Sequence, residues 1–113
     1  MSVKKSIVYL FGFSITSSDK IKSLLKILKL QVKTDTEISI VLIHDGVIGI
    51  SKRGKTPKLL LELLNLPLNT YAMIPDIKAR GIDPNHLINQ IKGIEYDELV
   101  DILAEKEHIV SWM

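Results

Sequence analysis

Apolar runs alternate with amphipathic segments along this chain, and the apolar runs predict β-strands. Ser6–Phe13 and Glu37–Ile43 are short, nearly continuous apolar runs rich in isoleucine, valine or aromatic residues, as is typical of strands covered on both faces. Three further strands are expected at Leu68–Ile74, Ile91–Glu95 and His108–Trp112. The pattern therefore predicts five strands.

The segment after the first strand predicts an amphipathic helix. It begins after Ser17, Ser18 and Asp19, residues that favour the N-cap of a helix. Apolar side chains then recur at helical spacing and are expected to face the core, at Ile21, Leu24, Leu25 and Leu28. Lysines lie between them and are expected to face solvent, at Lys20, Lys22, Lys26 and Lys29.

Two more helices and two short helical turns are expected in the rest of the chain. Thr56 and Pro57 are predicted as the N-cap and the first residue of a leucine-rich helix. Asp97 is expected to cap the last helix. Between them, Asp76–Gly81 predicts one helical turn that ends at a glycine cap, and Asp83 starts another short helix.

Strands that alternate with helices predict an α/β fold. The pattern is that of a three-layer α/β/α sandwich with a mostly parallel sheet. Residues 1–113 are expected to form a single domain, since no linker interrupts the chain. Ligands of such sheets bind at the carboxyl ends of the strands. A functional site is therefore expected in the loops 14–18, 44–49 and 75–80.

Composition narrows the class of protein. Hydrophobic residues make up 46% and charged residues 25%, which is ordinary for a globular protein, and a net charge of +2 indicates no particular partner. No apolar stretch approaches the length of a membrane span. The apolar start of the chain is better explained by a buried strand than by a secretory signal. We therefore expect a soluble, cytoplasmic protein without membrane contact.

The absence of cysteine limits the chemistry of the chain. Without a thiol it has no disulfide, no thiolate metal site and no sulfur nucleophile. The histidines His44, His86 and His108 lack the spacing that places metal ligands on one face. His44 is the one expected to be functional, because it follows a strand. We predict no catalytic residue, no metal and no cofactor.

One stretch fits a nucleotide-binding pattern but lacks its context. GISKRGKT, residues 49–56, matches G-x-x-x-x-G-K-[ST]. A phosphate-binding loop leaves a strand directly, whereas residues 46–50 intervene here and Pro57 keeps Thr56 out of a helix. We expect a basic loop instead. Lys52, Arg53 and Lys55 are candidate RNA contacts, although the absence of aromatic residues between them favours a solvated loop.

Three stretches together resemble the TusB/DsrH family of sulfur-relay proteins. They are VLIHDGVIGI, TYAMIPDIKARGI and IEYDELVDILAEKEHIVSW. Members of the family show Gln-Asp-Gly-Val after a strand, an acidic turn followed by Ala-Arg-Gly, an Ile-Asp-Tyr segment and a terminal Ser-Trp or similar. This chain departs from that pattern at His44, where the family has glutamine. Order, spacing and total length agree over nearly the whole chain.

The resemblance implies a DsrE/F/H-like sandwich that works beside two homologous subunits. Such complexes pass persulfide sulfur toward the 2-thiouridine of the tRNA wobble position, or act in sulfur-oxidation relays. The transfer needs a cysteine thiolate. Some members have a cysteine near the start of the first helix, where this chain offers only Ser17, Ser18 and Ser23. A hydroxyl cannot carry sulfane sulfur, which favours a supporting subunit.

Two hypotheses follow, with a nucleotide-binding loop as a distant third. The first is a cysteine-free subunit bound to cysteine-bearing DsrE/TusD-like and DsrF/TusC-like subunits, with an indirect contact to tRNA as a further possibility. The second is a self-associating module of the same fold that binds a small ligand or RNA at the strand-end loops. Tyr96 and Trp112 are candidate interface anchors, with core packing as the alternative. The candidates for a ligand or partner site are His44, Asp45, Gly46, Asp76 and Arg80.

Overall fold

The computed structural model describes residues 5–16 and 19–113. Five strands form one sheet in the order β4-β3-β2-β1-β5, and all four neighbouring pairs are parallel. The strands are β1 (Lys5–Phe11), β2 (Thr36–Leu42), β3 (Asn69–Met73), β4 (Ile91–Ile94) and β5 (His108–Trp112). The predicted strands are confirmed to within two residues at each end.

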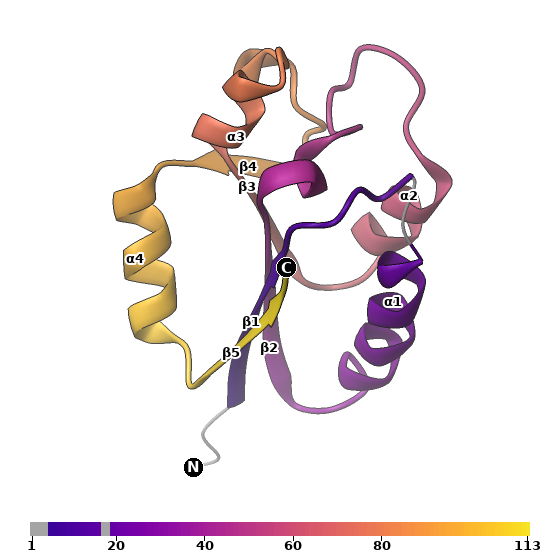
Figure 1. Ribbon diagram of the computed structural model, residues 1–113. Coiled ribbons are helices and arrows are strands. Elements are labelled where there is room, and N and C mark those ends of the chain that lie inside the picture. Colours follow the sequence, from indigo (N-terminus) through magenta and orange to yellow (C-terminus); the bar gives the residue numbers. More distant parts are fainter. Residues whose placement is uncertain (1–4, 17–18) are drawn as a thin grey trace.

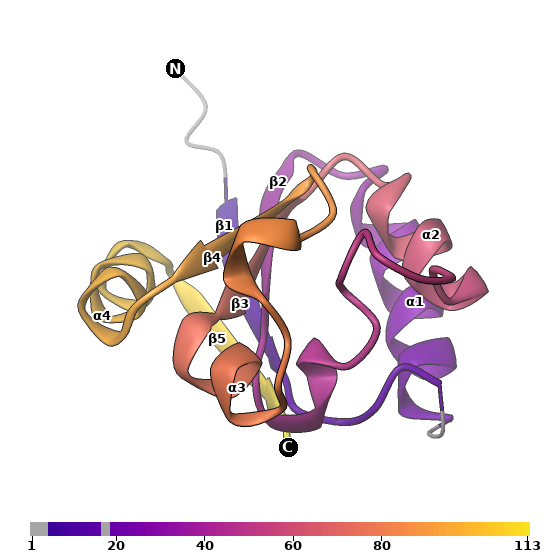
Figure 2. The ribbon, with the colours of Figure 1, turned by 90° about the horizontal axis from the view of Figure 1, so that it is seen from above.

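Helices cover both faces of the sheet (Figures 1 and 2). On one face lie α1 (Lys20–Gln31) and α2 (Lys58–Leu64), and on the other lies α4 (Tyr96–Glu105). The short helix α3 (Ile74–Ala79) lies over the end of β3, and its Ile77 is buried in the core on the α1–α2 side. Two 3-10 helices, η1 (His44–Val47) and η2 (Pro84–His86), lie in the connections. The predicted three-layer α/β/α sandwich is confirmed. In the part of the chain that is described, no helix is long and apolar enough to span a bilayer.

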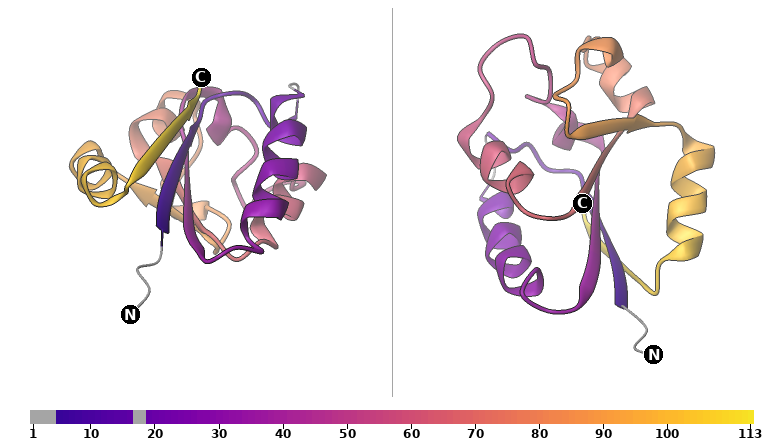
Figure 3. Two further views of the ribbon diagram at one scale, coloured as in Figure 1. Left: turned by 90° about the horizontal axis from the view of Figure 1, so that it is seen from below. Right: turned by 180° about the vertical axis from the view of Figure 1, so that it is seen from behind.

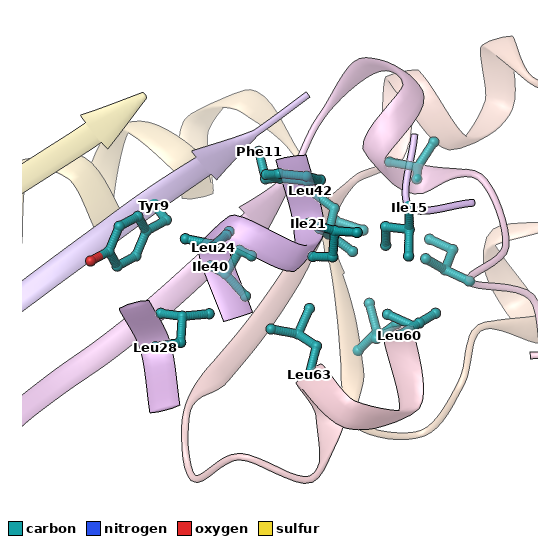
Figure 4. Packing of buried hydrophobic residues seen from close by; sticks show 14 of the residues in the cluster. Tyr9, Phe11, Ile15, Ile21, Leu24, Leu28, Ile40, Leu42, Leu60 and Leu63 are labelled. Carbon is teal, nitrogen blue, oxygen red and sulfur yellow. The ribbon is translucent and has the colours of Figure 1, made fainter. Parts of the chain in front are cut away.

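The larger core lies between the sheet and the α1–α2 layer (Figure 4). Side chains from β1 and β2 point toward apolar side chains of both helices, and none of these is more than 3% exposed. Packing of this density makes α1 and α2 integral to the fold. The residues are Tyr9, Phe11, Ile40, Leu42, Ile21, Leu24, Leu28, Leu60 and Leu63.

The smaller core lies between the sheet and α4. Its buried members come from four of the strands and from the residue that precedes η1. They are Val8, Val41, Ile43, Met73 and Ile94. The helix itself contributes only partly buried side chains, from Leu99, Ile102 and Leu103. No residue of α4 is fully buried. The α4 layer is therefore the less deeply buried of the two; Figure 3 shows α4 on the opposite side of the sheet from α1.

Two predicted helix caps in the first half of the chain need correction. Asp19 occupies the N-cap of α1, but its backbone is already helical and its side chain makes no capping bond. The alternative caps Ser17 and Ser18 lie outside the described residues. The prediction of Thr56 as the cap of α2 was wrong by one residue. Pro57 is the N-cap, because its ψ of 139° is extended and its carbonyl accepts from Leu61 N–H.

The cap predicted for the last helix was also wrong. Glu95, not Asp97, is the N-cap of α4. The Glu95 side chain accepts from the backbone N–H of Glu98, and the Glu98 side chain accepts from the backbone N–H of Glu95. Such a capping box satisfies two otherwise unpaired donors, so the helix begins before Asp97. The predicted glycine cap after α3 is confirmed, since Gly81 has a φ of +71° and ends that helix.

Candidate functional site

The carboxyl edge of the sheet brings together the loops that the sequence pointed to. Because all strands are parallel, β1, β2 and β3 end on the same side of the molecule. There, η1 follows β2 directly and contacts both β3 and α3. Figure 1 shows α3 above the end of β3. The polar residues of η1 and α3 therefore form one cluster, although they lie about thirty positions apart in the sequence.

Gly46 lets η1 sit directly against the end of β1. Ile43 N–H donates to Phe11 O over 2.9 Å, and Gly46 N–H donates to Ile43 O over 2.8 Å. A Cβ atom at Gly46 would lie 2.4 Å from Phe11 O, closer than atoms can approach. Only glycine fits this position, which fixes how His44 and Asp45 are presented.

His44 is held in an uncommon backbone conformation. Its φ of +48° lies in the left-handed region, and it is the only non-glycine residue with a positive φ in the described parts of the chain. Its side chain is 63% exposed, and its Nδ1 lies 3.9 Å from Asp76 Oδ1. The ring lies beside the bare backbone of Gly12 and near Met113. An imidazole is therefore presented to solvent next to a carboxylate.

Arg80 links the carboxylates of η1 and α3. Its Nε and Nη2 donate to Asp45 Oδ1 over 3.2 and 3.0 Å. Its Nη1 donates to the backbone oxygen of Asp76 over 3.3 Å and lies 3.9 Å from Asp76 Oδ1. The side chains of Arg80 and Asp76 are 26% and 18% exposed, so this pair is more shielded than Asp45. We call the four residues Asp45, Arg80, Asp76 and His44 the edge cluster.

The edge cluster can handle protons and charge, but it contains no group that can carry sulfur. One guanidinium faces two carboxylates, so the cluster is neutral when His44 is protonated and carries one negative charge when it is not. Histidine is the side chain suited to exchanging a proton in the neutral pH range. Over the described residues, no group of three histidine or acidic side chains could hold a metal ion.

The two aromatic candidates lie on different elements. Tyr96 begins α4 and is 61% exposed, so it is not a core residue. Trp112 lies on β5, packs partly against the larger core, and accepts a hydrogen bond from Gly12 N–H through its backbone oxygen. Core packing therefore explains the position of Trp112 in part, but it does not explain the exposed side chain of Tyr96.

The basic loop is tied to η2 by a network that the sequence did not predict. Arg53 Nη2 lies 2.7 Å from His86 Nε2, and His86 Nδ1 lies 2.8 Å from Asp83 Oδ2. The hydrogen bond from Asn85 N–H, and then the one with His86, lower the pKa of the Asp83 carboxyl. The sequence indicated that Asp83 starts a short helix. Nothing in the sequence indicated that Arg53, far earlier in the chain, would contact the histidine that Asp83 binds.

The loop 49–56 does not have the geometry of a phosphate-binding loop. Gly49 follows the 3-10 helix η1 instead of a strand, and α2 begins only at Lys58. Lys55 and Thr56 lie in irregular backbone, and Lys52, Arg53 and Lys55 are all exposed. The prediction that this stretch is a basic surface loop is confirmed.

An exposed apolar edge is a feature that sequence reasoning missed. Among the described residues β5 pairs only with β1, and the pairing of Ile109 with Val8 places Ile109 on the α4 face. Ile109 is 52% exposed, Val100 of α4 is 62% exposed and Met113 is 65% exposed. We call Ile109, Met113 directly after the strand, and the free side of β5 the β5 edge surface. Its apolar residues look like strand and helix core positions in the sequence, so no signal marked them as exposed.

The fold and the edge cluster first define the class: a single parallel α/β/α sandwich with a thiol-free polar cluster where its strands end. Solved structures share this fold. The ychN protein from E. coli matches with a TM-score of 0.74 at 14% identity, over 96% of this chain and 99% of that chain. MTH1491 from Methanobacterium thermoautotrophicum, a protein of unknown function, matches with a TM-score of 0.70 at 15% identity, over 95% and 98%.

Sequence comparison places the chain in a family. The model of the family described as DsrH like protein matches residues 16–109. Protein TusB from Yersinia pestis (strain Pestoides F) is 33% identical over 81 residues, which is 68% of this chain and 77% of that protein. Protein TusB from Yersinia pseudotuberculosis serotype O:1b matches to the same extent. The chain belongs to the TusB/DsrH family, and the predicted resemblance is confirmed.

Proposed function

We propose that this chain is a non-catalytic, cysteine-free subunit of a sulfur-relay complex. Membership of the DsrH family supports a sulfur-relay role of the TusB/DsrH type. The finer proposal is that the complex passes persulfide sulfur toward 2-thiolation of the tRNA wobble uridine, or serves a related sulfur-oxidation relay, in the cytoplasm. The observation that carries the supporting role is the absence of cysteine from all 113 residues. Persulfide transfer proceeds through thiolates, which partners must then supply.

The β5 edge surface supports docking of a homologous partner. A free strand edge offers unpaired backbone donors and acceptors, and proteins usually cover such edges. Here the edge strand carries the exposed apolar side chain of Ile109, and the exposed Met113 follows it directly. Exposed apolar surface next to an open edge is typical of an interface. The proposed partners are DsrE/TusD-like and DsrF/TusC-like subunits that carry the cysteine.

The edge cluster would complete a partner's sulfur site by presenting polar and charged side chains next to it. When an acceptor thiolate attacks the outer sulfur of a persulfide, that sulfur moves to the acceptor and the donor cysteine leaves as a thiolate. His44 would lie beside that thiolate as an exposed polar group, with its Nδ1 3.9 Å from Asp76 Oδ1.

Partner capture tests the proposal. The full chain is tagged, pulled from native extract, and its partners are identified by mass. We expect capture, in fixed stoichiometry, of a homologous protein that contains a cysteine able to carry persulfide. A homo-oligomer that ignores such a protein would contradict the proposal. So would isolated chain that carries sulfane sulfur covalently.

A second candidate function is a self-associating module that binds a small ligand or RNA at the strand-end loops. The observation that favours it is His44 at the position where the family has glutamine. Substitution of His44 by glutamine separates the two: as a relay subunit, the variant still captures its partner. A ligand-binding module should instead lose its ligand while remaining a homo-oligomer.

A further inference from the structure

The small net charge conceals a division of charge between the two helix layers. The sequence of α1, KIKSLLKILKLQ, contains four lysines and no acidic residue. The sequence of α4, YDELVDILAE, contains four acidic residues and no basic one. These helices lie on opposite faces of the sheet (Figure 1). The protein therefore has a positive face and a negative face, which a count of charges does not show.

Four lysines on the positive face form a stripe. Lys22, Lys26 and Lys29 follow one side of α1, and Lys33 continues that side just beyond the end of the helix. Their spacing of four, three and four residues keeps them aligned over about 16 Å. All four are exposed. We call them the lysine stripe.

The lysine stripe is unfavourable for the helix that carries it. Lysines four residues apart repel each other by a few tenths of a kcal/mol, as Lys22 with Lys26 and Lys29 with Lys33 do. Lys22 also lies near the positive end of the helix dipole. Only Lys22 and Lys29 have carboxylates near them, Asp19 at 3.8 Å and Glu62 at 3.7 Å. Among the described residues, Lys26 and Lys33 have no ion-pair partner.

The positive surface continues toward the carboxyl edge of the sheet. Helices α1 and α2 both begin at that edge, because each follows the carboxyl end of a strand through a loop or 3-10 helix. Lys58 begins α2, and Lys52 and Lys55 lie in the loop before it, all exposed. An anion bound along the lysine stripe would therefore extend to the edge where His44 is presented.

We propose that the lysine stripe binds the phosphate backbone of a double-stranded RNA stem. A regular row of lysines can contact successive phosphates without reading sequence. Residues 20–33 and 51–64 contain no aromatic side chain on which an unpaired base could stack, so a helical stem fits this face better than a single strand. The acidic α4 repels RNA from the opposite face. The identity of the partner as RNA rests on the proposed relay function.

Binding of a fluorescein-labelled RNA hairpin, followed by anisotropy over a range of salt concentrations, tests the proposal. The full chain is used alone and together with any partner that it captures. We compare Lys26→Gln/Lys33→Gln with Lys78→Gln/Lys92→Gln, which removes the same charge from α3 and β4. The first variant should bind about tenfold more weakly, with a salt slope reduced by about two. The second should bind like the parent chain, and both should keep its melting temperature.

Several outcomes would overturn the inference. An equal loss of RNA affinity in both variants would show that net charge, and not the lysine stripe, determines binding. Failure of the chain and its complex to bind the hairpin at about 50 mM salt would also overturn it, while successful partner capture would leave the proposed function intact. Lysine-dependent binding to phosphatidylglycerol vesicles, without RNA binding, would assign the stripe to a lipid surface instead. RNA binding without any captured partner would uphold the stripe and contradict the relay.

Discussion

Gly46 positions the edge cluster because it has no Cβ atom. Substitution by alanine would place Cβ 2.4 Å from Phe11 O, a backbone atom that cannot turn away. We expect Gly46→Ala to lower the free energy of unfolding by about 2 kcal/mol or more, as overpacking does in tight sites. Urea denaturation measures the change.

Gly12→Ala is the matched control for this prediction. A Cβ at Gly12 would lie 3.4 Å from His44 Cδ2, which is ordinary contact with a side chain that can move. The control should unfold at nearly the same urea concentration as the parent chain. Equal loss in both variants would show that the close approach of η1 to β1 does not constrain the site.

Tyr9 gives the chain a dependence on alkaline pH. Burial raises the pKa of its phenol above the usual value of 10.0, and its hydroxyl donates to Gln31 Oε1. Below pH 10.0, the usual pKa of tyrosine, the phenol is mostly neutral in both the folded and the unfolded chain. Above it the unfolded chain ionises first, so the free energy of unfolding falls as the pH rises from about 10 toward the raised pKa.

The measurement is the urea midpoint between about pH 9 and pH 11. Tyr9→Phe should show a shallower decline than the parent chain, because it lacks the group whose ionisation favours unfolding. Tyr96→Phe should keep the full decline, since Tyr96 is 61% exposed. Parallel curves for Tyr9→Phe and the parent chain would show that other groups, such as lysines, cause the alkaline loss.

At the scale of elements, the two cores indicate that α1 and α4 contribute unequally to the stability of the fold. Leu28 of α1 is fully buried in the larger core, whereas Leu103 of α4 is only partly buried against the smaller one. Leu28→Ala should therefore cost about 3 kcal/mol of unfolding free energy, and Leu103→Ala about 1 kcal/mol. Chemical denaturation ranks the two variants. The reverse order would mean that α4 carries more of the stability than its exposure indicates.

The capping box makes a second prediction for α4. Glu95→Ala removes the side chain that accepts from Glu98 N–H, so we expect a loss of about 1 kcal/mol. Asp101→Ala, an exposed position in the same helix, should change stability by less than about 0.5 kcal/mol. Both can be compared in urea. If Asp97→Ala proved more harmful than Glu95→Ala, the helix would begin where the sequence alone suggested.

Elements with a strong internal pattern could be predicted, but the N-caps of the α-helices could not. The apolar run of Glu37–Ile43 predicts β2 almost to the residue, because burial on both faces leaves few alternatives. Caps depend on which of several neighbouring polar groups reaches a free N–H. The sequence favours Asp97, because aspartate is a preferred N-cap residue, and only the mutual bonds of Glu95 and Glu98 show that Glu95 is the cap.

At the scale of the whole molecule, the location of the candidate site could be predicted because the strands of the sheet are parallel. Parallel strands end at one edge, which is enough to bring His44 and Asp45 toward Asp76 and Arg80. The left-handed backbone of His44 and the double contact of Arg80 with Asp45 depend on packing and had no sequence signal. The division of charge was equally hidden, because it appears only when helices are assigned to faces.

The exposed side chains of the β5 edge surface lead to the last prediction. Ile109 is 52% exposed, so Ile109→Lys should leave the fold intact while placing a charge in the proposed interface. Capture of the cysteine-bearing partner should fall at least tenfold, because burying an unpaired charge is costly. Leu61→Lys is the matched control, since Leu61 is 49% exposed on α2, in the opposite layer, and its capture should be unchanged.

The same two variants test whether the faces act independently. Partner docking at the β5 edge leaves the lysine stripe open, so a saturating partner should not weaken binding of the RNA hairpin. Ile109→Lys should then lose the partner and keep the salt-dependent RNA affinity of the parent chain. If Leu61→Lys lost the partner instead, the partner would cover the α1–α2 layer and compete with RNA. A protein with two charged faces could then engage only one of its two proposed partners at a time.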